Sequence, residues 1–236
     1  MAVFDLPQFS GPESLAQTAA SDWQREIAGL RSSKDAVSCA LSGGRIAREF
    51  FTALANLIKA EHLTLEGVHF FWSDERCVAA DNPESNFRLA NEFLFRQVAV
   101  LPEQIHRLRG EMAPRAAAAL GERELRQFTN CPPPKVPHID LVLLGMGEDG
   151  HVASLFPGEP EEHMATVYRA VTAVKPPPQR ITMDYGALAA ARDVWVLASG
   201  AGKHEALQAS LASGGRTPLG RVLNSRRSTR IYSDIP

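Results

Sequence analysis

An apolar run that ends in a glycine-rich turn constrains this chain more than any other feature of its sequence. Residues 141–145, Leu-Val-Leu-Leu-Gly, indicate a strand buried on both faces, which is typical of a parallel sheet covered by helices. The turn that follows carries Glu148, Asp149 and His151, and its glycines allow positive φ angles and close backbone approach. Ligands of such sheets bind beyond the carboxyl ends of the strands, so this turn is a candidate catalytic loop. Taken alone, the turn is better explained as a tight strand-to-helix connection with an incidental histidine, and the rest of the chain is needed to favour catalysis.

Strand-like and helix-like patterns alternate along most of the chain. The spacing of apolar residues predicts helices over residues 12–30, 45–59, 82–97 and 114–128, and another that opens at residues 200–203. Short apolar runs predict strands over residues 36–41, 68–72, 141–145, 167–174, 180–183, 193–199 and 229–232, with a minor strand at residues 105–106. This alternation predicts an α/β fold, a doubly wound, mainly parallel sheet with helices on both faces. With 236 residues and no internal repeat, we expect one domain over residues 1–236.

The composition excludes several classes of protein. Hydrophobic residues make up 44% and charged residues 22%, and no apolar run approaches the roughly 18 residues that span a membrane. The formal charge of −2, with scattered basic residues, gives no reason to expect binding to nucleic acid. The cysteines (Cys39, Cys77 and Cys131) lack metal-type spacing, and the first residues lack a secretory signal, so we expect a cytoplasmic protein. We further expect a monomer.

Four predicted strands end in polar or glycine-rich loops. These loops are residues 42–45 (Ser-Gly-Gly-Arg), 73–76 (Ser-Asp-Glu-Arg), 147–151 (Gly-Glu-Asp-Gly-His) and 200–203 (Gly-Ala-Gly-Lys). Any one of them is weak support for a functional site. Because the carboxyl ends of parallel strands lie at one edge of a sheet, however, all four are expected to meet there and to form one site.

Two of these loops and their cations favour an anionic ligand. Ser42, Gly43 and Gly44 precede a predicted helix, where free N–H groups and the helix dipole attract an anion. The loop lacks the P-loop lysine and the full dinucleotide pattern, so a lone phosphate or carboxylate is expected rather than a nucleotide. Arg76 and Lys203 can donate charge-assisted hydrogen bonds to such an anion.

Other side chains near these loops have two readings each. Arg45 and Arg88 are candidates to join the anion site, although Arg88 could equally be a solvated surface group. Asp74 and Glu75 could act in the site, or they could cap a helix or pair with neighbouring arginines. No two histidines have the helical spacing of a zinc site, so neither a metal nor a cofactor is expected.

The loops resemble the motifs of the 6-phosphogluconolactonase family, within the superfamily of glucosamine- and galactosamine-6-phosphate isomerases. Residues 145–158 (Gly-Met-Gly-Glu-Asp-Gly-His-Val-Ala-Ser-Leu-Phe-Pro-Gly) are similar to its most specific motif, residues 72–78 and 83–88 resemble its second, and residues 180–183 and 200–203 fit as well. The resemblance spans most of the chain and implies a parallel sheet flanked by helices. One departure stands out. Many relatives continue Ser-Gly-Gly with Ser-Thr-Pro, whereas this chain has Arg45-Ile46-Ala47, which replaces two hydroxyls with a guanidinium.

The resemblance implies hydrolysis of 6-phospho-D-glucono-1,5-lactone to 6-phosphogluconate in the oxidative pentose phosphate pathway, without a cofactor. In that reading His151 takes a proton from water, while Asp74 or Asp149 orients its ring, with Asp74 the preferred partner. Ser42 and Ser154 are disfavoured as nucleophiles, the latter because it is expected on the helix that follows the turn.

Two alternatives remain. A glucosamine-6-phosphate deaminase typically continues its glycine-histidine turn with Ile-Ala-Phe-Asn-Glu-Pro and has Asp-Glu-Tyr in its acidic loop. This chain has Val-Ala-Ser-Leu-Phe-Pro over residues 152–157 and Arg76 after its acidic pair, so the lactonase pattern is favoured. The second alternative is a sugar-phosphate-binding module without catalysis, a role that the same kind of fold has in some regulators.

Overall fold

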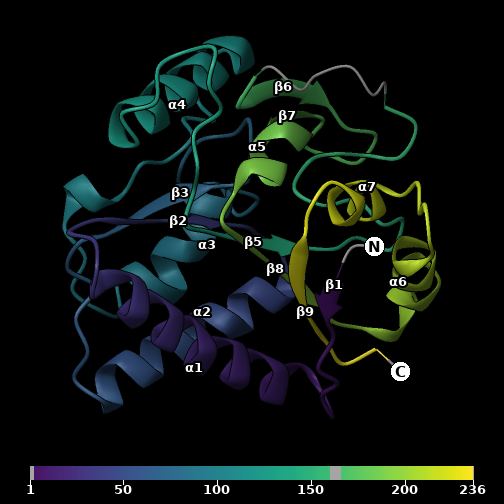
Figure 1. Ribbon diagram of the computed structural model, residues 1–236. Helices are drawn as coiled ribbons and strands as arrows, with labels where there is room; N and C mark the ends of the chain where they lie inside the picture. Colours follow the sequence, from purple (N-terminus) through teal and green to yellow (C-terminus); the bar gives the residue numbers. More distant parts are fainter. Residues whose placement is uncertain (1–2, 160–165, 236) are drawn as a thin grey trace.

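A parallel sheet lies at the centre of the computed structural model, which describes residues 3–159 and 166–235 (Figure 1). Within these residues the sheet has six strands in the order β1-β9-β8-β5-β2-β3, and every neighbouring pair is parallel. The strands are β1 (Val3–Asp5), β2 (Val37–Leu41), β3 (Val68–Trp72), β5 (Leu141–Gly145), β8 (Asp193–Ala198) and β9 (Ser228–Ser233). The predicted α/β fold with a mainly parallel, doubly wound sheet is confirmed.

The direction of winding reverses between β2 and β5. From β2 the chain moves outward to β3, whereas β5, β8 and β9 follow one another in the opposite direction. Such a switch point leaves a crevice at the carboxyl ends of its two strands, because the connections leave in opposite directions. The loops at that point are the predicted ones after residues 41 and 145.

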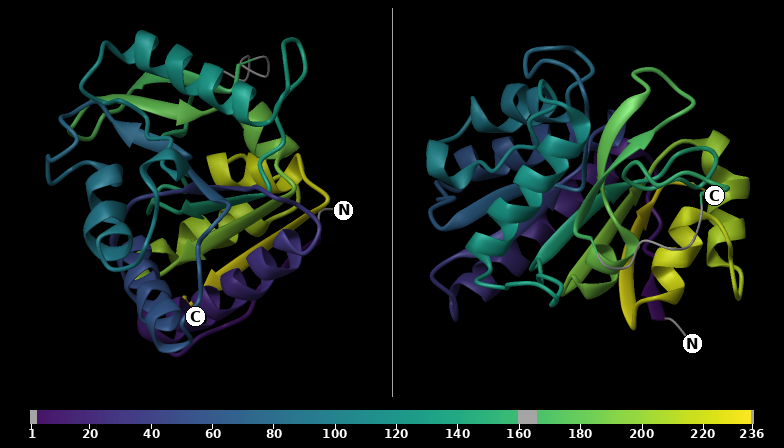
Figure 2. Two further views of the ribbon diagram at one scale, coloured as in Figure 1. Left: turned by 90° about the vertical axis from the view of Figure 1, so that its left-hand side faces the viewer. Right: turned by 90° about the horizontal axis from the view of Figure 1, so that it is seen from above.

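Amphipathic helices cover the sheet on both sides (Figures 1 and 2). Helix α1 (Pro12–Arg31) buries Leu15, Ala19, Trp23 and Ile27 at regular four-residue spacing, which matches the predicted pattern. It packs against α2 (Arg45–Ala60) on one side of the sheet. Helix α4 (Pro114–Phe128) lies on the other side, where it packs on two strands of a second sheet. The described helices also include α3 (Asn86–Ala90), α5 (Tyr185–Ala190), α6 (His204–Leu211) and α7 (Pro218–Asn224).

The described part of the chain also contains a three-stranded antiparallel sheet that the sequence did not predict. Its order is β4 (Asp74–Arg76), β7 (Gln179–Met183) and β6 (Tyr168–Thr172). The prediction of a loop at residues 73–76 is therefore wrong. The chain passes from β3 directly into β4, because Ser73 O accepts a hydrogen bond from Met183 N at 2.7 Å. A polar three-residue strand whose partner lies about a hundred positions away has no local pattern that reveals it.

Other expectations needed correction at element ends. The predicted helix over residues 82–97 is shorter, with α3 followed by a π-helical turn (Asn91–Phe95). Residues 105–106 form no strand, although Ile105 makes an isolated bridge to Phe70. Strand β1 and helices α5 and α7 were not predicted, although Thr217 and Pro218 form a usual helix start, with the Thr217 hydroxyl accepting from Gly220 N.

The core explains why the central strands read as continuous apolar runs. Every residue of β2 and the first four of β5 are buried, since helices cover both faces. The largest fully buried side chains include Trp23, Phe50 and Trp72, and they belong to one connected hydrophobic cluster. Within residues 3–159 and 166–235, no helix has the length and hydropathy that a membrane span requires.

Candidate active site

A polar cavity of about 300 Å³ opens at the carboxyl edge of the parallel sheet. All four predicted segments contribute to it, together with Asn86 at the start of α3, Lys175 from the connection between β6 and β7, and Arg180 of β7. Its lining consists of Ser42, Gly43, Gly44, Arg45, Ile46, Asp74, Arg76, Asn86, Gly145, Met146, Gly147, Glu148, His151, Ala153, Lys175, Arg180 and Lys203. The expected convergence of the loops at one edge is confirmed. Among these residues, cationic side chains outnumber carboxylates by five to two, so the cavity favours an anionic ligand.

Two glycines are needed for the loops to approach each other. A Cβ atom at Gly43 would lie 1.8 Å from Oδ1 of Asn86, and one at Gly147 would lie 2.0 Å from Nδ1 of His151. Any side chain at either position would therefore displace a residue that lines the cavity. Glycine is therefore required at these two positions for steric reasons.

His151 is held in place by its nearest carboxylate. Its Nδ1 atom lies 2.5 Å from Oδ1 of Asp149, and its backbone N–H donates to the same oxygen at 3.1 Å. The ring also packs against Phe156, with centroids 5.0 Å apart. Burial alone would raise the pKa of Asp149, but its hydrogen bonds to His151 outweigh this effect and hold the pKa below the ordinary value. An ionised Asp149 that accepts from Nδ1–H leaves the lone pair of Nε2 free to accept a proton.

The preferred partner in the sequence interpretation was Asp74, and the structure assigns this contact to Asp149 instead. Asp74 is buried, with its Oδ2 accepting from the Ser154 hydroxyl at 2.7 Å and its Oδ1 from Asn86 Nδ2 at 3.1 Å. Ser154 was expected on a helix after the histidine turn. It lies instead in a turn in which Val152 bridges to Leu155. Because these donors occupy Asp74, it lines the cavity as a fixed carboxylate next to the histidine turn.

Arg45 and Lys203 form one cationic group of the cavity. Arg45 is the first residue of α2, directly after Gly43 and Gly44. Burial, and next the positive charge of Arg45, lower the pKa of the Lys203 ammonium, while Glu148 opposes this. The two cations are therefore close enough to repel each other at the amino end of a long helix. A dianion bound there would relieve that repulsion.

Arg76 and Arg180 form a second cationic group. They are directly opposite each other in the antiparallel pair of β4 and β7. Burial, and next the charge of Arg76, lower the pKa of the Arg180 guanidinium. Arg76 Nη1 donates to the backbone oxygen of Glu84 at 2.7 Å, while its Nε is buried without a partner among the described residues. An unsatisfied donor at a cavity wall is suited to a ligand oxygen.

Arg88 does not reach this cavity. It lies on α3, where its Nε is 3.7 Å from a carboxylate oxygen of Glu92, and it lines a separate surface pocket with Arg96. The prediction that Arg88 joins the anion site is wrong. The motif over residues 83–88 still contributes to the cavity, because Asn86 lines it and Ser85 caps the helix that begins there.

Glu75 has the helix-capping position that was one of its two expected readings. It is buried, and its carboxylate accepts from the backbone N–H groups of Asn86 and Phe87 at 2.7 and 2.8 Å and from the Ser85 hydroxyl at 3.0 Å. These contacts tie the start of α3 to β4. Glu75 therefore fixes the positions of Asp74 and Arg76 on either side of it without lining the cavity itself.

Sequence reasoning missed three polar side chains of the cavity, namely Asn86, Lys175 and Arg180. Arg180 Nε donates to the backbone oxygen of Pro177 at 2.9 Å, and Nη2 lies 3.4 Å from the oxygens of Lys175 and Pro176. The buried guanidinium thus supports the hairpin tip that carries Lys175. The available signals were the family motifs over residues 83–88 and 180–183, which contain Asn86 and Arg180, and the proline run over residues 176–178. The place of this hairpin in space depends on the unpredicted pairing of β4 with β7.

No three His, Cys, Asp or Glu side chains in the described ranges, 3–159 and 166–235, are arranged to hold a metal ion. Cys77 borders β4, and burial, followed by the charge of Glu75, raises the pKa of its thiol to about 11. A thiol with so high a pKa is a poor nucleophile at neutral pH. His151 and the charged side chains around it are the candidate reactive groups of the cavity.

Comparison with known proteins gives a consistent result. Residues 10–231 match a family model described as glucosamine-6-phosphate isomerases/6-phosphogluconolactonase. A 6-phosphogluconolactonase of Streptomyces coelicolor is 34% identical over 224 residues, which cover 89% of this chain and 85% of that protein. A 6-phosphogluconolactonase of Treponema pallidum is 37% identical over 179 residues, covering 74% and 71% of the two chains.

Solved structures of similar proteins share the fold over nearly the whole chain. The 6-phosphogluconolactonase of Thermotoga maritima superposes with a TM-score of 0.82 at 27% identity, covering 98% of each chain. That of Trypanosoma brucei has a TM-score of 0.83 at 26% identity, covering 99% of this chain and 97% of the other. A monomeric glucosamine-6-phosphate deaminase reaches 0.81 at 20% identity with 97% of each chain covered, a likeness of fold alone.

Proposed function

The chain belongs to the family of glucosamine-6-phosphate isomerases and 6-phosphogluconolactonases, and from this we infer that it hydrolyses 6-phospho-D-glucono-1,5-lactone to 6-phosphogluconate in the oxidative pentose phosphate pathway. The observation that carries the assignment is a histidine whose Nδ1 is held by Asp149 in a cavity rich in cations. A lactone hydrolase needs a base for water, and a phosphorylated substrate needs positive charge at a distance from that base.

The phosphate group is proposed to bind where α2 begins. The N–H groups at Gly43 and Gly44, the dipole of a 16-residue helix, and the cations of Arg45 and Lys203 all favour a dianion there. Arg45 then takes the place of the hydroxyl donors that many relatives have in this loop. Binding the phosphate at this end would fix the sugar ring and place its C1 atom near His151.

His151 is proposed as the general base. Its Nε2 takes a proton from a water molecule as the water oxygen attacks C1, and Asp149 stabilises the imidazolium that forms. The C1–O5 bond then breaks, and the imidazolium returns the proton to O5, which becomes a hydroxyl group. The new carboxylic acid ionises and releases one proton to solvent. No covalent intermediate and no cofactor are required for this sequence.

Arg76 and Arg180 are proposed to stabilise the negative charge that develops on the carbonyl oxygen during attack. The repulsion between the two guanidinium groups in the free protein would be relieved as that charge forms. The Nε atom of Arg76, which has no partner among the described residues, would then gain a hydrogen-bond acceptor. Asp74, held by Ser154 and Asn86, is proposed to accept a hydrogen bond from a sugar hydroxyl. The sequence interpretation assigned Arg76 to the phosphate, and the two placements predict different kinetics.

We further propose that residues 1–236 act as a single lactonase domain, as a monomer in the cytoplasm that binds a small sugar-phosphate lactone rather than nucleic acid or membrane. The connected hydrophobic cluster on both sides of the sheet and the charge of −2 support these proposals. Size-exclusion chromatography with light scattering would test the monomer, since a dimer would double the measured mass.

The reaction class can be tested by offering two substrates. Purified protein receives freshly prepared 6-phosphogluconolactone or glucosamine-6-phosphate, and proton release and ammonia release are followed in parallel. We expect proton release from the lactone far above its spontaneous hydrolysis, with no ammonia from the amino sugar. Ammonia release alone would establish the deaminase alternative, and binding of either compound without turnover would establish the non-catalytic module.

A further inference from the structure

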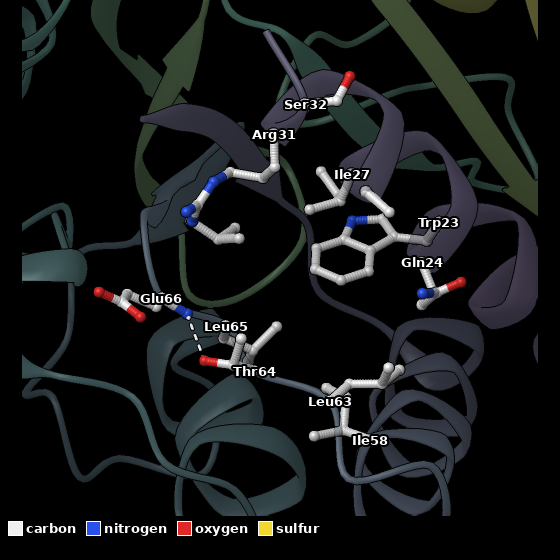
Figure 3. A pocket seen from close by; sticks show the side chains of 12 residues that line it. Trp23, Gln24, Ile27, Arg31, Ser32, Ile58, Leu63, Thr64, Leu65 and Glu66 are labelled. Atoms are coloured by element: carbon white, nitrogen blue, oxygen red, sulfur yellow. Dashed lines mark hydrogen bonds between the residues drawn. The ribbon is translucent and has the colours of Figure 1, made fainter. Parts of the chain in front are cut away.

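A second cavity, of about 400 Å³, lies beside helix α1 (Figure 3). It is formed by the end of α1, the end of α2 and the segment that leads into β3, so it faces the amino ends of the strands. Residues of the two helices and of this segment line it, among them Trp23, Ile27, Arg31, Ile58, Leu65 and Glu66. It shares no lining residue with the catalytic cavity.

The floor of this cavity is apolar and firmly anchored. Trp23, Ile27 and Leu65 belong to the hydrophobic core. The indole N–H of Trp23 is directed at Sγ of Cys39 at 3.3 Å, and its ring stacks on Phe70 with an interplanar angle of 11°. Because the N–H is engaged in the core and the side chain is only 1% exposed, the indole adds no polar group to the cavity. Such a floor suits the apolar part of a small ligand.

Arg31 supplies the one cation that lines this cavity among the described residues. Its Nε atom is buried without a hydrogen-bond partner there, and its guanidinium forms no ion pair with a described carboxylate. The group is held against Gly67, where a Cβ atom would lie 2.1 Å from Nη1. Arg25 on the same helix, in contrast, pairs with Asp22. A buried donor without a partner is costly in free energy, and an anionic ligand would remove that cost.

We propose that this cavity binds a small organic acid with one carboxylate and an apolar body. The carboxylate pairs with the guanidinium of Arg31, and the apolar body lies over Ala28 and Leu63, which are more exposed than the apolar residues of the floor (Figure 3). The exposed carboxylate of Glu66 also lines the cavity and repels a second negative charge, which favours a monocarboxylate over a dicarboxylate or a phosphate. The site is independent of the proposed catalytic function.

Binding here should not compete with the product of the reaction. The cavity lies at the amino ends of β2 and β3, whereas Ser42 and Ser73 follow the carboxyl ends of the same strands. A ligand at one edge therefore leaves the other edge accessible.

The proposal is tested on the full chain by isothermal titration calorimetry with octanoate as the probe, at saturating 6-phosphogluconate. 1-Octanol is the neutral counterpart, with the same apolar chain length but no charge. We expect saturable binding of octanoate by the unaltered protein. Octanoate should bind Arg31→Gln about tenfold to a hundredfold more weakly, because a hydrogen bond to a charged group contributes roughly 1.5–3 kcal/mol. For the same reason, 1-octanol should bind the unaltered protein more weakly than octanoate does, by a similar factor. Arg25→Gln, on the same helix, is the matched control and should bind octanoate like the unaltered protein.

Ala28→Phe provides a second variant, which keeps Arg31 and narrows the cavity from an exposed position on α1. It should also weaken octanoate binding. The proposal is overturned if octanoate binds Arg31→Gln as tightly as the unaltered protein, if Ala28→Phe has no effect, if binding does not saturate, or if 6-phosphogluconate displaces the octanoate.

Discussion

Arg76 and Arg180 occupy directly paired positions on the antiparallel strands β4 and β7, and both side chains line the cavity that contains His151. Like charges at directly opposed positions destabilise a sheet. The pair is therefore best explained by a ligand whose negative charge it meets. The cavity lies where the parallel and antiparallel sheets meet, with His151 in the turn after β5 of the first and the arginine pair on β4 and β7 of the second.

Arg76→Gln should lower kcat by about 100-fold with a smaller change in KM, because removing one donor to a developing oxyanion typically costs 100- to 1,000-fold. Initial rates of lactone hydrolysis over a range of substrate concentrations would measure this. Arg88→Gln is the matched control, since Arg88 lies outside the cavity and its loss should leave both constants unchanged. A raised KM with unchanged kcat in Arg76→Gln would instead return Arg76 to the phosphate.

Lys203→Gln should raise KM for the phosphorylated lactone by about tenfold or more, with little change in kcat, because it removes a charge-assisted bond to the phosphate. Arg45→Ser should act in the same direction. The comparison substrate is glucono-1,5-lactone without the phosphate, for which neither change should alter kcat/KM. Equal losses on both lactones would show that these cations do not contact the phosphate.

Asp149→Asn should reduce kcat by roughly 1,000-fold or more, because an amide cannot hold the ring in the required tautomer or stabilise the imidazolium. Asp74→Asn should have a smaller effect on kcat, since Asp74 makes its contacts with Ser154 and Asn86 rather than with the ring. The two variants each exchange one carboxylate for an amide in the same cavity region, so each controls for the other. The reverse order of effects would restore Asp74 as the orienting group.

Folding stability should fall in mild acid because of His106. Its ring stacks on Phe71 and its Nε2 lies 3.0 Å from Nδ1 of His69. Burial, and next the charge of His69, lower the pKa of His106 to about 4. The unfolded chain, in which a histidine has a pKa near 6.5, then binds more protons than the folded one between those values. The stabilising contribution is complete above about pH 6.5 and is lost as the pH falls toward 4.

Urea unfolding at pH 7.5 and pH 5 measures this effect. The unfolding midpoint of the unaltered protein should be lower at pH 5, and His106→Gln should show a smaller difference between the two pH values. His62→Gln, an exposed histidine, is the control and should retain the full difference. An equal pH difference in His106→Gln would exclude this histidine as the source.

The sequence predicted the elements whose pattern is local. The apolar runs of β2, β3 and β5 and the spacing in α1 and α4 appear in the structure within about one residue of the expected bounds. The convergence of four loops also followed, because it depends only on parallel strands sharing an edge. Local patterns and one topological rule were enough to locate the cavity.

What could not be predicted depends on pairing across long separations. The strand β4 has three polar or charged residues, and only its hydrogen bonds to β7 make it a strand. Without that pairing, Arg180 and Lys175 could not be placed near His151. The choice between Asp74 and Asp149 likewise depended on tertiary contacts, since Ser154 and Asn86 take up the carboxylate of Asp74.

The most direct test of the central claim is the single-turnover rate of 6-phosphogluconolactone hydrolysis by His151→Ala, measured above the spontaneous rate. Removal of a general base should lower the rate by roughly 100- to 10,000-fold, while KM in steady state changes little. His204→Ala, at the start of α6 and outside the cavity lining, should keep the full rate. If His151→Ala retains full turnover, the histidine is not the base and the account is contradicted.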